Sequence, residues 1–593
     1  MAIRQKVYAD FTGGLNNVNS KDTINSGTTR TESPDMMNVE YLGLGGIKTM
    51  EGNFQVGDTQ DSAIVGGWEY RKGNDKYMVI ATQDGDVKIY NPATEEFDLI
   101  YSFIHPSPRV SFCNMNNGIV VTNGIDDLIF YEKGRKKILS GTVNIVEGSV
   151  DVSGSGTLFK TELKPGDSIQ IGNGVYFVDA IENDESLTLR STTDETLTSV
   201  NIYLSEVSEC NATLINEEDP NVATPIRGRA IQYFKGRLWI GGDNGVFYSQ
   251  VCLYNGWDIA YDAGVLYSIY NDSSEVKALG LFSDFLMIHK EFSSYILTIE
   301  STGDTIQVQP YTNISCDSQQ SWVVSNTKYY IYSAENMGIY PIGQRTVFSD
   351  RFVGEEISTK VRSIFRRIRT ADTDKIFAVT LPNKRWMLFY LPLNDSVGSN
   401  NVLIFDFQTK SWLYRKIPQN VTIAFNYNNY VYVGADVTLD DGTVVHKVLR
   451  EFSGSTFDGD MINSYYRMPW LSWYNGYVQS FAEYVIELDN EYNNRFYIRT
   501  YKDGLLNHED RIIDSETLLG EGLIWEGIVD LGDNFTYWDE DEWVASGFQN
   551  LRMLLPNNVF EDFQIEIGTN TAGQGFAFYS MSFRRIEPDE APW

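Results

Sequence analysis

The sequence predicts an all-β protein built around a β-propeller, and three observations lead to that prediction. Short apolar runs rich in Val, Ile, Tyr, Phe and Trp are separated by Asn, Asp and Gly, whereas long helical patterns are scarce. A pattern of strand, polar turn and second strand recurs about every 44 residues. One long interruption of this series, between the copies at Gly118 and Arg237, indicates an inserted domain.

The repeated unit has the length of one propeller blade. Two clear copies read "YMVIATQDGDVKIY" and "GIVVTNGIDDLIFY", each with a polar turn between two apolar runs. The copies begin at Tyr77, Gly118, Arg237, Phe285, Tyr329, Arg385 and Tyr430. Most spacings fit a four-stranded blade of ~40–50 residues. Seven copies predict a propeller of six to eight blades, with seven as the first choice; ordinary hairpins in unrelated sandwiches are the alternative.

The interruption predicts a small inserted β-barrel at residues 141–205. From Gly141 to Leu204, short runs are separated by the turn sequences "EG", "SGSG", "KPGD", "GNG" and "NDES". Alternation of apolar and polar residues is clear in "DSIQI" and "SLTLR", as expected for strands. We expect the barrel to fold by itself. We also expect it to leave and re-enter the propeller at one loop, where insertions are tolerated.

The rest of the chain divides around the propeller. The propeller is expected to occupy residues 61–140 and 206–452, after a separate arm at residues 1–60. From about Ser453 the repeat fades, but runs such as "SFAEYVIELDN" and "GFAFYSMSFRRI" still have the character of strands. Residues 453–593 are therefore predicted to form a C-terminal antiparallel β unit that resembles a sandwich.

The arm combines turn residues with large apolar side chains. The stretch "DFTGGLNNVNSKDT" carries two adjacent glycines and three asparagines, residue types that tolerate positive φ. A frayed terminus is the simplest interpretation, but disordered tails are usually charged and poor in apolar groups. We therefore expect residues 10–53 to be an ordered assembly element. Its candidate interface residues are Asp10, Phe11, Gly13, Gly14, Leu15, Met36 and Met37.

One long helix is predicted over Val353 to Ile368, "VGEEISTKVRSIFRRI". The spacing places apolar residues on one face, with glutamates in the first turn and arginines in the last, as the helix dipole favours. A solvated helix on the propeller rim is the simpler interpretation of its basic cluster. Contact with an acidic partner or a neighbouring subunit is the alternative, with Arg362, Arg366 and Arg367 as the candidate contact residues.

Composition argues against several classes of function. The formal net charge is −33, so the chain is not expected to wrap nucleic acid. The four cysteines and four histidines show no metal-ligand spacing, and no motif for phosphate binding or nucleophilic catalysis occurs. No signal peptide and no membrane span are indicated. We therefore expect no enzyme, no catalytic residue, no cofactor and no metal site.

Several stretches resemble a family of phage proteins. "DFTGGLNNVNSKDT", followed by "ESPDMMNVEYLGLGGIKTMEGN", is similar to the N-terminus of the tail stabilisation, or nozzle, proteins of short-tailed bacteriophages, also called tail tubular protein B. "GRLWIGGDNGVFYSQVCLYNGWDI" and "ALGLFSDFLMIHKEFSSYILT" resemble that family too. The inserted segment is similar to small β-barrel modules of phage tail proteins. The resemblance covers residues 1 to about 450 and is weaker beyond.

The resemblance implies a structural virion protein that forms a homohexameric ring below the portal and adaptor. Its expected partners are other copies of itself, the phage adaptor or head–tail connector protein, and tail fibres or other tail proteins. Double-stranded DNA would pass the ring without tight binding. The implied location is the virion tail, after synthesis and assembly in the host bacterial cytoplasm. The alternatives are a virion propeller that binds or degrades glycans, and a monomeric ligand-binding propeller.

Overall fold

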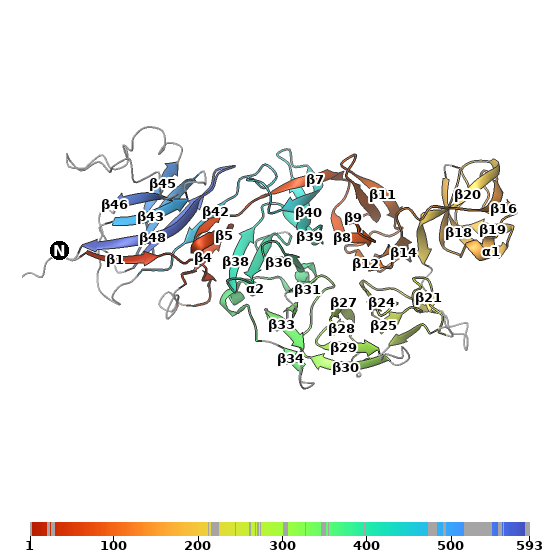
Figure 1. Cartoon of the computed structure of the whole chain (residues 1–593), viewed down its shortest axis with the longest axis horizontal. Coiled ribbons are helices and arrows are strands. Elements are labelled where there is room, and N and C mark those ends of the chain that lie inside the picture. The colour runs from red at the N-terminus through yellow and green to blue at the C-terminus, as the bar shows by residue number, and fades with distance from the viewer. Residues whose placement is uncertain are drawn as a thin grey trace, which may run out of the picture.

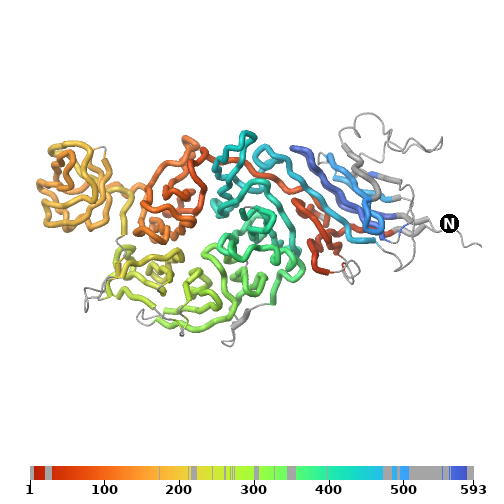
Figure 2. The backbone as a smooth tube through the Cα atoms, turned by 180° about the vertical axis from the view of Figure 1, so that it is seen from behind, coloured from red at the N-terminus to blue at the C-terminus, as the bar shows by residue number. Residues whose placement is uncertain are grey.

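Three β modules lie in a row in the computed structural model, with the propeller between a sandwich and a barrel (Figure 1; Figure 2 shows the same row from behind). The structure describes residues 3–19, 24, 30–172, 174–210, 213–214, 224–243, 245–259, 262–266, 269, 272, 274–299, 306–325, 328–344, 351–353, 355–396, 398–471, 483–489, 494–514, 548–554, 560 and 562–586.

The propeller has seven four-stranded blades among the described residues, which confirms the predicted fold class. Each copy of the sequence repeat marks the second strand of one blade. The first three blades are β8 (Ile64–Lys72), β9 (Asp75–Thr82), β10 (Asp86–Asn91) and β11 (Glu96–Ser102); β12 (Ser111–Met115), β13 (Gly118–Thr122), β14 (Leu128–Tyr131) and β20 (Leu197–Cys210); and β23 (Ala230–Phe234), β24 (Arg237–Gly242), β25 (Gly245–Tyr248) and β26 (Gly264–Leu266).

The next three blades follow the chain without interruption. They are β27 (Val276–Phe282), β28 (Phe285–Lys290), β29 (Ser294–Ile299) and β30 (Ile306–Thr312); β31 (Trp322–Ser325), β32 (Lys328–Ser333), β33 (Gly338–Gln344) and β34 (Arg351–Val353); and β35 (Phe377–Leu381), β36 (Trp386–Leu391), β37 (Asn401–Asp406) and β38 (Ser411–Lys416). The middle strands β36 and β37 are buried along their whole length, because neighbouring blades cover both faces of a blade.

The seventh blade closes the ring with a strand from the N-terminal side of the propeller. It consists of β39 (Asn420–Tyr427), β40 (Tyr430–Thr438), β41 (Val444–Glu451) and β7 (Asn53–Gln60). β7 lies in the segment expected to be a separate arm, yet it pairs with β41 from Asn53 opposite Glu451 to Gln60 opposite His446. Since β39 also contacts β8, the first and last blades meet and the ring is complete.

The closure contains a fully buried ion pair. Arg415 Nη2 lies 2.8 Å from Glu451 Oε2, and both side chains are inaccessible to solvent. Arg415 also donates to the carbonyl oxygens of Glu51 (2.6 Å) and Gly52 (3.1 Å), and Asn53 Nδ2 donates to Glu451 Oε1 at 2.7 Å. The pair therefore ties the segment just before β7 to the last two blades.

The inserted segment forms a closed six-stranded barrel. Its strands pair in the order β15 (Lys137–Ile145), β16 (Asp151–Ser155), β19 (Ser186–Leu189), β18 (Gly174–Asn183), β17 (Asp167–Ile171) and β20, and β20 pairs again with β15. The short helix α1 (Phe159–Glu162) contributes Phe159 to the barrel core. Alternate residues of the strands point inward, which the sequence pattern predicted.

The chain leaves the propeller for the barrel through a turn at residues 132–136 and returns through a continuous strand. The first part of β20 closes the barrel, and its last residues pair with β14 as the outer strand of the second blade. Tyr101 of β11 donates to Glu209 Oε1 at 2.7 Å and packs edge-on against Phe177 of the barrel, with ring centroids 5.8 Å apart. Arg190 pairs with Glu209 from the barrel side. Both connections lie between the third and fourth strands of the second blade, so only the return differs from the expected loop, because it is a strand.

Deleting the barrel should leave the propeller folded but less stable. Lys137 pairs directly with Leu204, so removal of residues 137–204 and insertion of an Asn-Gly turn would reconnect two adjacent chain ends. We expect a cooperative thermal transition at a lower Tm, because Tyr101 and Glu209 lose their barrel partners. A deletion product that circular dichroism and limited proteolysis show to be unfolded would contradict the prediction.

The remaining module is a sandwich built from both ends of the chain. One sheet contains β46 (Phe548–Leu554), β43 (Glu483–Asp489), β48 (Ala577–Ile586), β6 (Ile47–Thr49), β5 (Val39–Tyr41) and β1 (Ile3–Tyr8). The other contains β4 (Asp35–Met37), β42 (Ser464–Arg467), β47 (Phe563–Thr569), β44 (Arg495–Lys502) and β45 (Leu505–Asp514). Residues 1–60 are thus not a separate arm: their described strands complete this sandwich and the seventh blade.

Short elements lie in the connections between these strands. They are β2 (Gly14–Leu15), β3 (Glu32–Ser33), η1 (Gly43–Gly45), β21 (Thr213–Leu214), β22 (Thr224–Pro225), η3 (Thr359–Val361), α2 (Arg362–Phe365) and η4 (Thr370–Lys375). Asn38, at a φ of 55°, links sandwich and propeller. Its side chain donates to Lys416 O (3.2 Å) and Asn463 O (2.8 Å) and accepts from Lys416 N–H at 2.8 Å.

The long helix expected over Val353–Ile368 is wrong in length. Among the described residues of that range, only those of η3 and α2 are helical. The segment before them is bonded to β33 instead, because Ile357 N–H donates to Ile339 O at 3.1 Å and Ile339 N–H donates to Ser358 Oγ at 3.0 Å. These sheet-like contacts compete with helix formation. The prediction that Val361, Ile364 and Phe365 form an apolar face is confirmed, since all three are buried in the main core.

Candidate functional site

The apolar residues expected at an assembly interface lie inside this chain's own core. Phe11 and Met36 are fully buried, Leu15 is nearly so, and Met37 is half-buried in β4. Phe11 packs edge-on against Tyr466, with ring centroids 5.5 Å apart. The structure thus places these side chains between the sandwich sheets and against the sixth blade.

Asp10, Gly13 and Gly14, the other interface candidates of this segment, determine the course of its backbone. Asp10 Oδ1 accepts from Thr12 N–H at 3.0 Å, which closes a turn after β1. A Cβ on Gly13 would lie 2.5 Å from Thr31 O, and Gly14, at a φ of +76°, passes so close to the sixth blade that a Cβ would lie 2.7 Å from Trp412 O. The two adjacent glycines are therefore needed for close packing within the chain.

The basic candidates lie together beside α2 and are largely exposed. Arg362 Nη2 donates to Asn336 O at 3.2 Å, and Arg367 Nη2 lies 3.0 Å from Asp395 Oδ2. Arg366 is exposed, and within the described ranges it has no hydrogen-bond or ion-pair partner. The structure brings these three residues to one surface, but separates them from the N-terminal candidates in the core.

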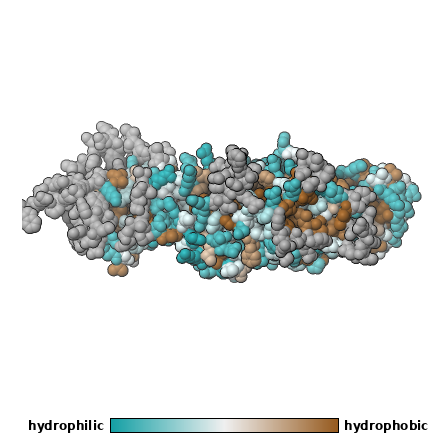
Figure 3. All heavy atoms as spheres, turned by 90° about the horizontal axis from the view of Figure 1, so that it is seen from below, coloured by the Kyte–Doolittle hydropathy of each residue, from teal (hydrophilic) through white to brown (hydrophobic). Residues whose placement is uncertain are grey.

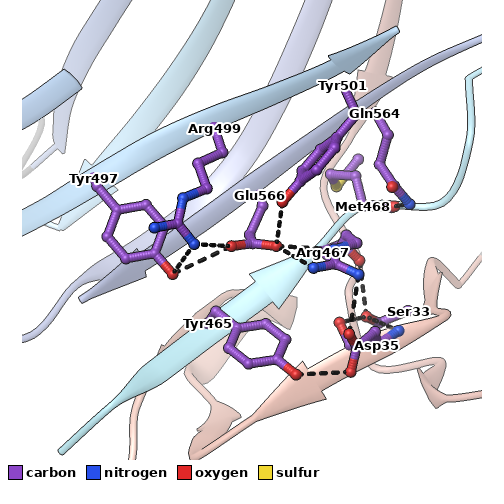
Figure 4. A network of polar contacts seen from close by, with 10 residues as sticks. All are labelled: Ser33, Asp35, Tyr465, Arg467, Met468, Tyr497, Arg499, Tyr501, Gln564 and Glu566. Carbon is purple, nitrogen blue, oxygen red and sulfur yellow. Dashed lines mark hydrogen bonds and ion pairs between the residues drawn. The ribbon is translucent and has the colours of Figure 1, made fainter. Parts of the chain in front are cut away.

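Sequence reasoning missed a polar network on the outer face of the second sandwich sheet (Figure 4). At its centre, the nearly buried Glu566 of β47 accepts hydrogen bonds from Arg467 Nε (2.8 Å), Arg499 Nη1 (3.3 Å), Tyr497 OH (3.2 Å) and Tyr501 OH (3.2 Å). These donors come from β42 and β44, the two strands that flank β47. One carboxylate therefore orders polar side chains on three strands.

The network continues to the N-terminal strand β4. Arg467 Nη1 lies 3.0 Å from Asp35 Oδ2, and Tyr465 OH donates to Asp35 Oδ1 at 2.8 Å. Ser33 Oγ donates to Arg467 O at 2.7 Å. Figure 4 shows how Arg467 points between the two carboxylates. The contacts thus fasten the first part of the chain to the C-terminal sheet.

A small pocket opens beside the network. Its volume is about 260 Å³, and its lining residues are Asn463, Tyr465, Arg467, Tyr497, Arg499, Glu566 and Asn570. Aromatic rings and amides are suited to hydrogen bonding and stacking with a small polar group. The two arginines are balanced by Glu566 and Asp35, so the pocket does not present a strong excess of either charge.

Burial and the neighbouring carboxylates shift the pKa of three polar side chains at the pocket. Burial, together with the Asp35 carboxylate, raises the pKa of the Tyr465 hydroxyl, and burial and Glu566 raise the pKa of Tyr501. Burial disfavours the charge of Arg467, but the neighbouring Glu566 outweighs it and raises the pKa of the guanidinium. The tyrosines therefore remain protonated donors, and Arg467 remains a cation.

A second polar cluster lies at the centre of the propeller. Arg109 donates to Thr422 O and Asp374 O, each at 3.2 Å, and lies 4.6 Å above the Phe377 ring. Burial lowers the pKa of Arg109 to about 10, with a further contribution from the nearby Arg229. These hydrogen bonds to backbone carbonyls join the start of the second blade to the sixth and seventh blades, so Arg109 stabilises the packing of the three blades.

Histidines and cysteines form no metal-binding cluster among the residues that the structure describes. No group of three or more His, Cys, Asp or Glu side chains there could hold a metal ion. His289 is fully buried between Ser294 Oγ (2.7 Å from Nδ1) and Tyr329 OH (2.8 Å from Nε2), so both ring nitrogens have partners within the fourth and fifth blades. None of the helices in the described ranges has the length and apolar character needed to cross a membrane.

His289 should make the propeller sensitive to acid. Burial lowers its pKa to about 3, whereas an unfolded histidine titrates near 6.5. Below pH 6.5 the unfolded state binds a proton that the folded state does not, so stability falls as the pH drops toward 3, by up to about 1.4 kcal/mol per pH unit. His289→Gln should show a shallower loss of unfolding free energy between pH 6.5 and 5; parallel profiles would contradict this.

The described residues define a seven-bladed propeller protein with a barrel insertion and a sandwich made from both chain ends. No protein-family model matches the sequence, and no curated protein matches it. Among solved structures, the phage phi92 endosialidase is similar with 11% identity, a TM-score of 0.28, and coverage of 75% of this chain and 76% of that chain.

YCF48 bound to D1 peptide is similar with 9% identity and a TM-score of 0.36, covering 70% of this chain and 98% of that chain. At these TM-scores, neither similarity bears on the function of this chain. The resemblance to nozzle proteins stays a prediction that these comparisons do not test.

Proposed function

We propose that the protein is a structural subunit of the tail of a short-tailed bacteriophage, and that six copies form a nozzle ring below the portal and adaptor. The resemblance of residues 1 to about 450 suggests this role. The observation in the structure that best supports it is that buried and half-buried charged residues make structural contacts between separate parts of the chain. Arg109, Arg415, Arg467 and Glu566 all join separate strands or blades of one elongated body.

Apolar side chains also remain exposed, as expected for a protein that acts in an assembly. Seen from below, apolar residues gather at the surface over the middle of the molecule and toward the barrel (Figure 3). Val251, Leu253 and Phe292 are exposed apolar residues of the third and fourth blades. Surfaces of this kind mark contacts with other proteins when they are contiguous.

The charge of the chain suits a conduit for DNA. A net charge of −33 per copy gives a ring whose field repels phosphate, so double-stranded DNA would pass without being held. We expect the surface that faces the channel to be acidic or neutral. The role needs no catalytic residue, cofactor or metal.

The mass of the purified full-length protein tests the proposal. Multi-angle light scattering should give six chains per particle at high protein concentration, and electron microscopy should show a six-fold ring. The ring should not retain double-stranded DNA at ~0.15 M salt, where contacts with phosphate still persist. A protein that stays monomeric up to the highest soluble concentration, or a channel lined by Lys and Arg, would contradict the proposal.

Glycan binding is a second candidate, favoured by the pocket beside Glu566. Two tyrosines and two asparagines line a volume of about 260 Å³, which is suited to a single sugar ring or a similar polar group. The binding of host surface polysaccharide by the wild-type protein, and its loss in Tyr497→Ala, would support this candidate. Polysaccharide turnover by the pure protein would identify an enzyme instead.

A further inference from the structure

The barrel carries a row of two aliphatic side chains, a tyrosine and a glutamine on its outer surface. Ile138 of β15 pairs with Tyr203 of β20, Tyr203 pairs with Gln170 of β17, and Gln170 pairs with Val175 of β18. Directly paired residues on neighbouring strands have side chains about 5 Å apart on the same face. The four residues therefore form one continuous row across four strands, which we call the barrel row.

The barrel row does not contribute to the barrel core. Core positions alternate with it along the strands and are filled by buried residues such as Leu139, Ile169 and Ile202. By contrast, 56% of Ile138 and 55% of Val175 are exposed, and Tyr203 and Gln170 are half-buried. A barrel that faced only water would be expected to carry polar residues at such positions.

Positive charge borders the barrel row in a chain that is otherwise acidic. The segment "KGRKK" at residues 133–137 leads directly into Ile138. Lys136 Nζ lies 4.9 Å from the centre of the Tyr203 ring. The Lys137 side chain is 65% exposed, and its Nζ lies 3.9 Å from Glu162 Oε1, so Lys136 is the clearer cation of this surface. This surface combines apolar and aromatic groups with cations, which is complementary to an acidic surface that has apolar contacts.

A second copy of the chain supplies such a surface. Each copy has a net charge of −33, and its own barrel exposes Asp179, Glu182 and Glu185 along β18 and in the turn after it. The basic segment and these acidic positions lie at opposite ends of the barrel row, because Lys136 and Lys137 precede Ile138 at the start of β15 whereas Asp179 follows Val175 on β18. A contact between unlike surfaces of identical subunits is head-to-tail, and it generates a closed ring when the rotation between subunits permits.

We propose that the barrel row, with Lys136 at its border, is the centre of a head-to-tail contact with an acidic surface of a second copy. This inference rests on the ring of the proposed function and names the module through which neighbouring subunits meet. The row alone is smaller than a stable interface, which buries ~800 Å² per partner. The residues around it therefore form the polar rim.

The double variant Ile138→Glu/Val175→Glu tests the contact. Two carboxylates in the row would face an acidic neighbour, so the concentration needed for ring formation should rise at least 10-fold in light scattering. The matched control is Val146→Glu/Leu158→Glu, which adds the same charge at two exposed apolar residues of the barrel outside the row. The control should form rings as the wild type does, and circular dichroism should show both variants folded.

Lys136→Glu provides a second test that leaves the barrel core unchanged. It should weaken ring formation, and should do so more at low salt than at 0.5 M salt, since salt screens exposed charges. If both row variants form rings at wild-type concentrations, the inference is wrong while the proposed ring stands. If they form rings but fail to recruit another tail protein, the row binds that protein and not a second copy. A wild-type protein that never exceeds a monomer would overturn both proposals.

Discussion

Replacing Arg415 with Met is expected to lower the free energy of unfolding of the propeller by about 3–5 kcal/mol. The variant would leave the Glu451 carboxylate buried without its cation, and removing one partner of a buried ion pair costs this much. It would also remove the hydrogen bonds to the carbonyl oxygens of Glu51 and Gly52, which fix the chain just before β7. Because β7 closes the ring, urea unfolding should begin at the seventh blade.

Two further variants separate the ion pair from the loss of packing. Arg415→Met/Glu451→Met should recover part of the lost stability, since two apolar groups leave no buried charge. The control is the pair Arg71–Glu69, whose arginine side chain is 64% exposed, so Arg71→Met should cost less than about 1 kcal/mol. If Arg415→Met unfolded at the wild-type urea concentration, the closure would not depend on the buried pair.

The fold class could be predicted because each blade repeats a local pattern. In most blades the turn between the second and third strands is short, and its polar residues stand between apolar runs, as in "RLWIGGDNGVFY" from Arg237. The barrel could be predicted for the same reason, since its strands are separated by short turns. Local patterns of this kind predict strand order within a blade or barrel.

The pairing of distant segments could not be predicted. β7 pairs with a strand almost 400 residues later, and β1 pairs with β48 near the end of the chain. The partner of an edge strand depends on tertiary packing, which periodicity does not encode. The sequence therefore predicts a separate arm before β7, although Phe11 and Met36 belong to the core of the sandwich.

The sequence indicates which face of the sheet the residues of the polar network occupy. In "YYRM", "FYIRTY" and "FQIEI", polar and aromatic residues alternate with buried apolar ones, so Arg467, Arg499 and Glu566 share one face of their sheet. The alternation predicts that each residue points away from the core. It does not predict that the three meet, because that requires the order of β42, β47 and β44.

Replacing Phe11 with Ala is expected to destabilise the sandwich by about 3–5 kcal/mol, the usual cost of truncating a buried phenylalanine. Phe11 is fully buried and packs edge-on against Tyr466 of one sheet and Phe578 of the other, at centroid distances of 5.5 and 5.1 Å. The ring therefore fills the space between the two sheets. Limited proteolysis should cut the sandwich of the variant first, while the propeller remains protected because β7 is intact.

The matched control is Val18→Ala, which truncates an exposed residue of the same segment and should change the stability by less than about 0.5 kcal/mol. The comparison distinguishes two roles of the N-terminal segment. If the segment acts mainly through the sandwich core, Phe11→Ala fails to form rings only under conditions in which its sandwich unfolds. At low temperature, where the variant is folded, it should form rings. If Phe11→Ala were as stable as the wild type but failed to assemble, the side chain would act at an interface between subunits, and its burial within one chain would not describe its role.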